Sequence, residues 1–182
     1  MQYLVVGAGP AGVIAAETLR RQDRGSDITL IGDEPEPASS RMALPYYLAG
    51  QIEESGTHLR QDPGHFERLD INQLRARVRS VDTHAHRLRL DTGDSLGYDR
   101  LLLATGSHPI APPIPGLDHP DVHHCWTIAD ARNIAARTAG GTRVALIGAG
   151  FIGSLGRIVM GAQIKHRHGH DGEAFFTPQT LS

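Results

Sequence analysis

The chain has 182 residues, of which 40% are hydrophobic and 21% are charged, as expected for one globular domain or one domain and part of another. The formal net charge of −2 provides no basic field for a nucleic-acid partner. The single cysteine, Cys125, excludes an internal disulfide, a paired-cysteine zinc site and a redox dithiol, and it suits a cytoplasmic protein. No segment reaches the roughly 20 apolar residues of a membrane helix, so we expect no membrane association.

The first 34 residues predict a strand, a glycine turn, a helix and a second strand. Residues 2–6 (QYLVV) and 28–31 (ITLI) are short apolar runs typical of buried strands. Between them, GAGPAG at 7–12 precedes residues 13–21 (VIAAETLRR), whose spacing and composition favour a helix. An acidic pair follows the second strand. This order is typical of a βαβ unit that binds a dinucleotide.

Each glycine of the turn has a separate physical use in such a unit. Gly7 allows a tight turn out of the strand, Gly9 lets a diphosphate approach the backbone, and Gly12 lets the helix pack closely on the strand. The first turn of the helix then offers unpaired N–H groups to the phosphates. Asp33 or Glu34 can accept hydrogen bonds from ribose hydroxyls; we slightly prefer Glu34, although the register of the loop leaves both open.

Residues 35–103 predict a loop that contains Arg41, a short helix in ALPYYLAG at 43–50, and a small sheet, whereas residues 51–70 are polar and stay unassigned. The turn DTGD at 91–94 separates the second and third strands of that sheet. Arginine alternates with Leu or Val in this region, which favours a solvent-facing side over a phosphate patch. The three predicted strands are residues 74–82, 86–90 and 98–104.

The Pro-rich stretch 109–121 predicts a linker, after which a second βαβ unit begins. A capping pattern at Thr127 and Asp130 predicts a helix that runs to about residue 140. Residues 143–147 (RVALI) predict a strand, and a second glycine turn, GAGFIG, follows at 148–153.

The expected continuation does not follow the second turn. Gly156 and Gly161 disfavour a helix, and KHRHGHDGE at 165–173 is too polar to predict a strand. We therefore expect a chain that is truncated or altered after about residue 154. Its alternating histidines predict a solvated, irregular tail rather than a metal site. Cys125 is expected to be a small buried residue at a helix entrance rather than a nucleophile.

Four motifs together resemble the pyridine nucleotide-disulfide oxidoreductase superfamily over about residues 1–154. The first three motifs are the glycine turn at 7–12, the glycine turn at 148–153 and LLATGSHP at 102–109. The fourth, SRMALPYYLAG at 40–50, resembles the branch of rubredoxin, ferredoxin and nitrite reductases. The resemblance implies an α/β chain, with a Rossmann-like FAD-binding βαβ unit and a three-stranded β-meander, followed by the start of a second dinucleotide-binding unit. We expect residues 1–112 to be the N-terminal part of the FAD domain and residues 113–182 to be an incomplete NAD(P)H domain.

The resemblance also implies cofactor contacts. Arg41 matches an arginine near the flavin phosphates or the isoalloxazine, and Val78 matches a residue whose backbone meets the adenine. The residues of the first turn that match the site for the ADP part of FAD are Gly7, Gly9, Pro10, Ala11 and Gly12. The turn that passes close to the cofactor matches Ala104, Thr105 and Gly106. The turn for the NAD(P)H pyrophosphate matches Gly148, Gly150 and Gly153.

By this resemblance the protein is an FAD-dependent oxidoreductase that moves electrons from NAD(P)H through flavin to a small redox protein or a small molecule. The sequence departs from the family in two ways: Pro45 and Tyr46 stand where many relatives carry a lysine near the flavin, and the Cys-x4-Cys dithiol is absent. No side chain is assigned to the hydride step. The alternatives are an incompetent fragment that binds an adenine nucleotide weakly or not at all, a flavin monooxygenase or amine oxidase, and a non-enzymatic binding subunit.

Overall fold

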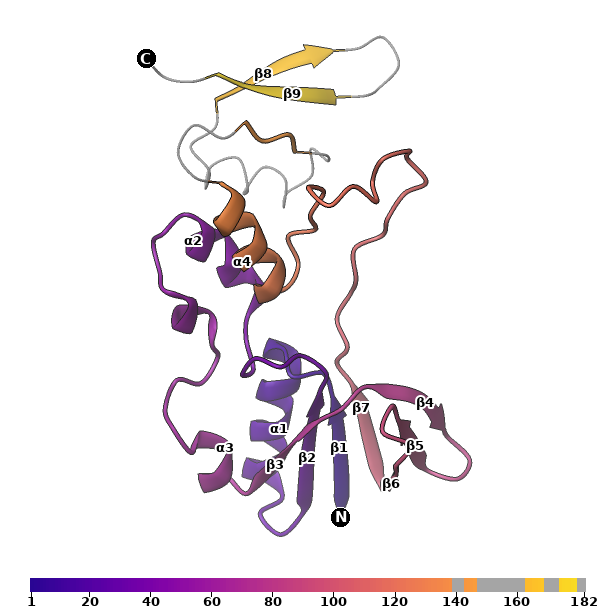
Figure 1. Cartoon of the computed structure of the whole chain (residues 1–182). Helices are drawn as coiled ribbons and strands as arrows, with labels where there is room; N and C mark the ends of the chain where they lie inside the picture. Colours follow the sequence, from indigo (N-terminus) through magenta and orange to yellow (C-terminus); the bar gives the residue numbers. More distant parts are fainter. Residues whose placement is uncertain (139–142, 147–162, 169–173, 180–182) are drawn as a thin grey trace. The chain divides into compact units, whose positions relative to one another are not determined.

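The computed structural model describes residues 1–138, 143–146, 163–168 and 174–179 (Figure 1). The chain is divided into two compact units. The first unit consists of Met1–Ser40 and His58–His108, and the second consists of Arg41–Thr57 and Pro109–Ser182. Each unit has a hydrophobic core of its own. The division into an FAD domain up to residue 112 and an NAD(P)H domain after it stays a prediction.

A four-stranded parallel sheet organises the first unit. Its strand order is β3-β2-β1-β7, and β1 pairs with β2 on one side and with β7 on the other. Helix α1 connects β1 to β2, so the predicted strand, turn, helix and strand are confirmed (Figure 1). The elements are β1 (Gln2–Val6), α1 (Pro10–Gln22), β2 (Asp27–Gly32), β3 (Ile71–Arg75) and β7 (Arg100–Leu103).

The two central strands, β1 and β2, are buried on both faces, which is why they read as nearly continuous apolar runs, whereas most residues of the edge strands β3 and β7 are exposed or half-buried. Alternate residues of β1 belong to different cores. Val5 packs with α1 and with helix α3 (His65–Arg68), while Leu4 and Val6 pack against a second, antiparallel sheet. Leu88 of the antiparallel sheet is fully buried in the core that it shares with Leu4 and Val6.

The antiparallel sheet is the predicted meander, but its strands differ from those expected. It contains β4 (Val78–Asp82), β5 (Arg87–Leu90) and β6 (Ser95–Gly97). The single strand predicted at 74–82 is wrong, because its first part is β3 of the parallel sheet and only its second part is β4. The strand predicted at 98–104 corresponds to β7, also in the parallel sheet.

The alternation of arginine and leucine in β5 has the predicted effect. Leu88 and Leu90 are buried in the core, whereas Arg87 and Arg89 are exposed. The predicted turn at 91–94 is confirmed between β5 and β6, where the amide of Leu90 donates to the carbonyl oxygen of Asp94 at 3.0 Å. The arginine row of β5 is therefore a solvent-facing side of the sheet.

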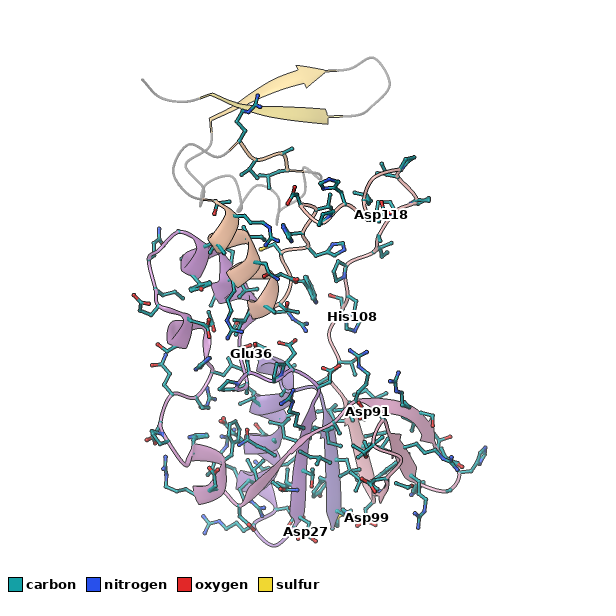
Figure 2. All side chains as sticks on the ribbon, in the orientation of Figure 1. Asp27, Glu36, Asp91, Asp99, His108 and Asp118 are labelled. Atoms are coloured by element: carbon teal, nitrogen blue, oxygen red, sulfur yellow. The ribbon has the colours of Figure 1, made fainter. Side chains whose placement is uncertain are left out.

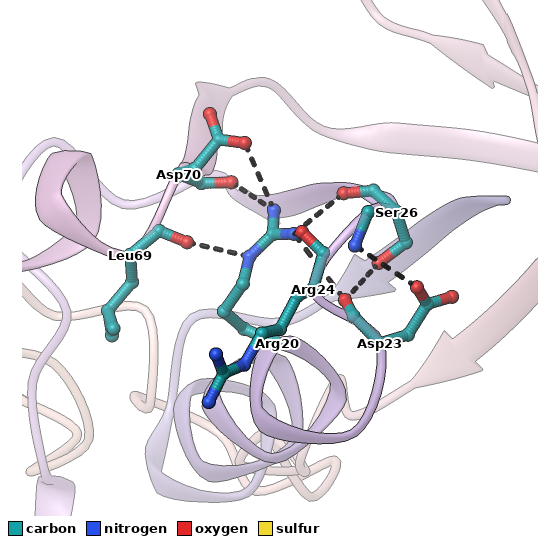
Figure 3. Close-up of polar contacts among 7 residues, drawn as sticks. Arg20, Asp23, Arg24, Ser26, Leu69 and Asp70 are labelled. Atoms are coloured by element: carbon teal, nitrogen blue, oxygen red, sulfur yellow. Dashed lines mark hydrogen bonds and ion pairs between the residues drawn. The ribbon is translucent and has the colours of Figure 1, made fainter.

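Arg20 is a buried arginine that joins three segments of the first unit (Figure 3). It lies near the end of α1, and only 8% of its surface is exposed. Its guanidinium donates to carbonyl oxygens of the turn that leads into β2 and of the segment that leads into β3. These acceptors are Arg24 and Ser26 at 2.9 Å, Leu69 at 2.7 Å and Asp70 at 2.5 Å. One side chain thus ties the helix end to the starts of two strands.

Glu17 is a second buried charge on α1. Its carboxylate accepts from Nε and Nη2 of Arg60 at 2.6 and 2.8 Å, and it lies 2.9 Å from Nε2 of His65. The hydrogen bond from Arg60 holds the pKa of Glu17 below its ordinary value of 4.5, although burial raises it. Folding therefore favours the charged form of this carboxyl.

The lowered pKa predicts an acid-sensitive contribution to stability. A carboxyl with a lower pKa in the folded state stabilises the fold above its unfolded pKa and loses this effect as the pH falls through the folded pKa. We expect the free energy of unfolding to fall below about pH 4.5, and to fall less steeply in Glu17→Gln. Urea unfolding at a series of pH values measures this. The exposed neighbour Glu67 supplies the control: if Glu67→Gln flattens the profile as much, the assignment to Glu17 is wrong.

The second unit contains short helices around a small core. Leu44 of α2 is buried with Ile128 and Ala131 of α4. The carboxylate of Glu54 pairs with the guanidinium of Arg132 at 2.6 and 2.7 Å. The elements are η1 (Arg41–Ala43), α2 (Leu44–Leu48), η2 (Glu54–Thr57) and α4 (Ile128–Arg137). The short helix predicted at 43–50 is therefore confirmed.

The start of α4 follows the predicted capping pattern. The amide of Asp130 donates to Oγ1 of Thr127 at 3.1 Å, and the amide of Thr127 donates to Oδ2 of Asp130 at 2.8 Å. The helix ends at Arg137, slightly before the predicted end. The Pro-rich residues 109–121 contain neither helix nor strand, as predicted for a linker. No helix within the described ranges has the length and apolar character needed to cross a membrane.

The last part of the chain differs from two predictions. The strand expected at 143–147 is not formed in the described residues 143–146. In the region considered too polar for a strand, β8 (Gln163–His168) pairs antiparallel with β9 (Ala174–Gln179). Pairing between two backbones satisfies their N–H and C=O groups whatever the polarity of the side chains, so polarity alone was a poor reason to exclude a strand.

Candidate functional site

The first glycine turn lies at the carboxyl end of β1, where the parallel strands on both sides hold it. The amide of Gly7 donates to the carbonyl oxygen of Ile31 in β2 at 2.7 Å, and the amide of Ala104 after β7 donates to the carbonyl oxygen of Val6 at 2.7 Å. Helix α1 then begins at Pro10, with Gly9 in extended conformation as its N-cap. The strand-to-helix bend required of a dinucleotide turn is therefore present at residues 7–12.

Two of the three glycines are required by contacts within the chain. Gly7 has a φ of +115°, and a Cβ on it would lie 2.1 Å from the carbonyl oxygen of Ala104. A Cβ on Gly12 would lie 1.8 Å from the carbonyl oxygen of Gly7. Both contacts involve backbone, which cannot rotate away as a side chain can. These glycines therefore serve the turn itself.

Gly9 differs from the other two glycines. A Cβ built on it would meet no atom of the described residues within 4 Å, and its backbone angles suit any residue. The adjacent end of α1 has no acidic residue in its first turn and no side-chain cap, so no side chain of the helix start neutralises its partial positive charge. Open space beside unpaired amides fits an anionic group such as a diphosphate.

The acidic pair lies next to this turn. A Cβ on Gly32 would approach the Cβ of Ala8 to 2.8 Å, so the end of β2 contacts the turn directly. Asp33 follows at once, and its Oδ2 accepts from Nε of Arg77 at 2.8 Å. Glu34 is half-buried and also has an interaction partner. Both residues thus follow β2 at its carboxyl end, the edge at which a βαβ unit that binds a dinucleotide has its ribose.

Two further predicted segments lie at the same edge of the sheet. The carbonyl oxygen of Ala104 is the closest atom to the Cβ position of Gly7, so the turn at 104–106 lies against the first glycine turn. Gly106 adopts a φ of +68°, a conformation that favours glycine. Val78 begins β4 just after β3, whose end pairs with Gly32. The fold thus brings the turn at 104–106 against the glycine turn at 7–12, although about 100 positions separate them in the sequence.

Four predicted residues remain, namely Arg41 and the three glycines of the second turn. Arg41 belongs to the second unit, where its Cζ lies 5.0 Å from the centre of the Trp126 ring. This distance is typical of a cation–π contact. Gly148, Gly150 and Gly153 lie outside the described residues.

Cys125 does not occupy the buried position expected for it, because its side chain is exposed. Surrounding protein atoms, together with the carboxylate of Asp130, raise the pKa of the thiol. A raised pKa leaves less thiolate at neutral pH, which argues against a nucleophilic role. No group of three or more His, Cys, Asp and Glu side chains suited to a metal occurs among the described residues.

Sequence reasoning missed Arg77 as a residue of this region. It belongs to the arginine-rich stretch 75–89, for which the sequence favours a solvent-facing side over a phosphate patch, and 44 positions separate it from Asp33. A signal was nevertheless present. Arg77 immediately precedes Val78, which the resemblance had placed near the adenine.

Comparisons with known proteins agree with this geometry. A family model described as pyridine nucleotide-disulphide oxidoreductase matches residues 1–155, close to the 1–154 of the sequence resemblance. The chain is 36% identical over 153 residues to a probable ferredoxin reductase of Castellaniella defragrans, covering 84% of this chain and 37% of that protein. It is 30% identical over 167 residues to an NADH oxidase of Methanocaldococcus jannaschii, covering 84% of this chain and 36% of that protein.

The fold agrees as well. The crystal structure of a covalent putidaredoxin reductase–putidaredoxin complex matches with a TM-score of 0.72 and 27% identity, over 87% of this chain and 39% of that one. The chain thus spans less than two-fifths of the length of each of these three proteins. Because the family model covers most of its residues and its turns have the required form, the chain belongs to the pyridine nucleotide-disulphide oxidoreductase family.

Proposed function

We propose that this chain supplies the FAD-binding part of an oxidoreductase that carries electrons from NAD(P)H to a small redox protein. The observation that carries the proposal is the open position at Gly9. Gly7 and Gly12 are required by the packing of the turn, whereas no atom of the described residues lies within 4 Å of a Cβ on Gly9, beside the unpaired amides of α1. A glycine at this position leaves room for a ligand to approach the backbone, and the packing of the turn does not require it.

Different residues of the chain would bind different parts of FAD and NAD(P)H. The first turn, made of Gly7, Gly9, Pro10, Ala11 and Gly12, would surround the diphosphate of FAD. The donors would be the unpaired amides at the start of α1, because Pro10 has no N–H and the amide of Gly7 donates to Ile31. Asp33 or Glu34 would accept from the ribose, the backbone of Val78 would meet the adenine, and Arg41 would approach the flavin or its phosphates. The turn beside the cofactor would be Ala104, Thr105 and Gly106. The pyrophosphate of NAD(P)H would lie on Gly148, Gly150 and Gly153.

The redox chemistry in this proposal belongs to the cofactors. Bound FAD supplies acceptance of hydride from the nicotinamide and release of electrons to the acceptor, and the protein contributes binding and orientation. The names of the relatives support a donor and an acceptor: one is an NADH oxidase, one is a ferredoxin reductase, and one was crystallised with putidaredoxin. We therefore propose NADH as the donor and a ferredoxin-like protein as the acceptor.

Gly9→Ala tests the site without disturbing the fold. We expect the variant to bind FAD at least about tenfold more weakly, because the added methyl group occupies the place of the diphosphate. Its free energy of unfolding should change by less than about 1 kcal/mol, since the methyl group meets no protein atom and the N-cap tolerates alanine at modest cost. Quenching of flavin fluorescence on titration with the chain measures the affinity.

Gly25→Ala is the matched control, because its added methyl group also meets nothing within 4 Å and lies outside the site. This variant should bind FAD as the native chain does. Native affinity in Gly9→Ala, or an equal loss in both variants, would contradict the proposed function.

A further inference from the structure

Asp33 and Arg77 form an ion pair beside the first glycine turn that the fold does not need for stability. Nε of Arg77 lies 2.8 Å from Oδ2 of Asp33, and the two side chains are 56% and 40% exposed. Ion pairs this exposed contribute little to folding free energy, because water and salt screen them. The pair nevertheless stands at the carboxyl end of β2, where the βαβ pattern predicts the ribose.

The backbone on both sides of this pair is firmly held. The amide of Arg77 donates to Oδ1 of Asp91 at 2.9 Å, and the amide of Asp91 donates back to the carbonyl oxygen of Arg77 at 2.9 Å. The preceding amide, of Ala76, donates to the carbonyl oxygen of Gly32 at 3.0 Å. Figure 2 shows Asp91 toward the end of the sheet at which β1 and β2 finish, away from Asp27 and Asp99. Arg77 is therefore anchored next to the residue that precedes Asp33.

This arrangement leaves one carboxylate oxygen available. Within the described part of the chain, Oδ2 of Asp33 is the acceptor for the guanidinium of Arg77, and Oδ1 of Asp33 accepts no hydrogen bond. A carboxylate fixed through one oxygen presents the other in a defined place, and less freedom is lost when it binds a ribose hydroxyl. Glu34, in contrast, is half-buried and already has an interaction partner, whereas Asp33 is exposed.

We infer that Arg77 is a positioning residue for the nucleotide: it holds Asp33, and Asp33 rather than Glu34 accepts from the ribose hydroxyls. This inference rests on the proposed dinucleotide site and adds to it a residue that the family motifs do not mark. Arg77 acts through Asp33 and has no direct contact with the ribose.

The test compares two ligands that differ only in the ribose. The full chain is titrated calorimetrically with ADP and with 2′,3′-dideoxy-ADP. Asp33→Asn and Arg77→Met should each weaken ADP binding by about tenfold, the scale of a hydrogen bond to a charged group, and should leave dideoxy-ADP binding unchanged. The double variant should lose no more than Asp33→Asn alone, because both changes remove one shared contact.

Glu34→Gln decides between the two candidate ribose acceptors: if Asp33 is the acceptor, the preference for ADP over dideoxy-ADP stays in this variant. Arg79→Met, at an exposed arginine of β4, is the matched control for Arg77→Met and should also keep the preference. Arg77→Lys keeps a charged donor and should restore part of the preference, and it replaces Arg77→Met if circular dichroism shows that the methionine variant is unfolded.

The outcomes separate this inference from the proposed function. If the native chain binds neither FAD nor ADP, the proposed function is wrong and the inference is wrong with it. If ADP binds but Glu34→Gln abolishes the preference, or if Arg77→Met weakens both ligands equally, only the role given to Arg77 and Asp33 is overturned.

Discussion

Replacing Gly12 by alanine is expected to lower the free energy of unfolding by about 3 kcal/mol or more, the upper range for overpacked positions. In an ordinary helix the same change would stabilise by roughly 1 kcal/mol, because alanine favours the helix more than glycine does. At Gly12 the new Cβ would lie 1.8 Å from the carbonyl oxygen of Gly7 and 3.4 Å from Cδ1 of Leu30. Helix α1 would have to move away from β1, so the steric effect exceeds the gain in propensity.

Chemical denaturation followed by circular dichroism measures this change. Gly25→Ala is again the control and should stay within about 0.5 kcal/mol of the native chain. A Gly12→Ala chain as stable as the native one would show that α1 does not pack against the turn as described. Together with Gly9→Ala, the experiment separates a glycine required by the fold from a glycine required by the ligand.

Replacing Arg20 by methionine is expected to cost about 3 kcal/mol or more, because breaking a buried, charge-assisted network leaves its partners unsatisfied. Methionine fills much of the space of the aliphatic stem but donates no hydrogen bond. Four carbonyl oxygens would lose their charged donor (Figure 3), those of Arg24, Ser26, Leu69 and Asp70. Asp70 has a φ of 51°, an uncommon conformation that the contact with Arg20 helps to hold.

Arg21 is the matched control on the same helix. Its side chain is exposed, and its guanidinium donates a hydrogen bond to Oγ1 of Thr18 at 2.8 Å. Arg21→Met should therefore change the free energy of unfolding by less than about 0.5 kcal/mol. Equal losses in the two variants, measured by urea denaturation, would mean that the Arg20 network contributes no more than an exposed side chain.

The sequence by itself determined the βαβ unit, the family and the elements whose cause is local. An apolar run followed by GAGPAG specifies the bend at residues 7–12, since glycine alone suits the φ of Gly7 and the space at Gly12. The capping box at Thr127 depends on residues three positions apart, so it could be recognised without a structure. The turn at 91–94 was found for the same reason.

Only the tertiary structure decided which strands share a sheet and which side chains meet. Residues 74–82 look like one strand, but β3 and β4 pair with different partners, and pairing is a long-range property that local patterns do not encode. Likewise, three glycines that read alike in the sequence proved to have different surroundings, with Gly9 alone of the three facing open space. The meeting of Asp33 and Arg77 joins residues 44 positions apart, and it follows from the alignment of β2 with β3.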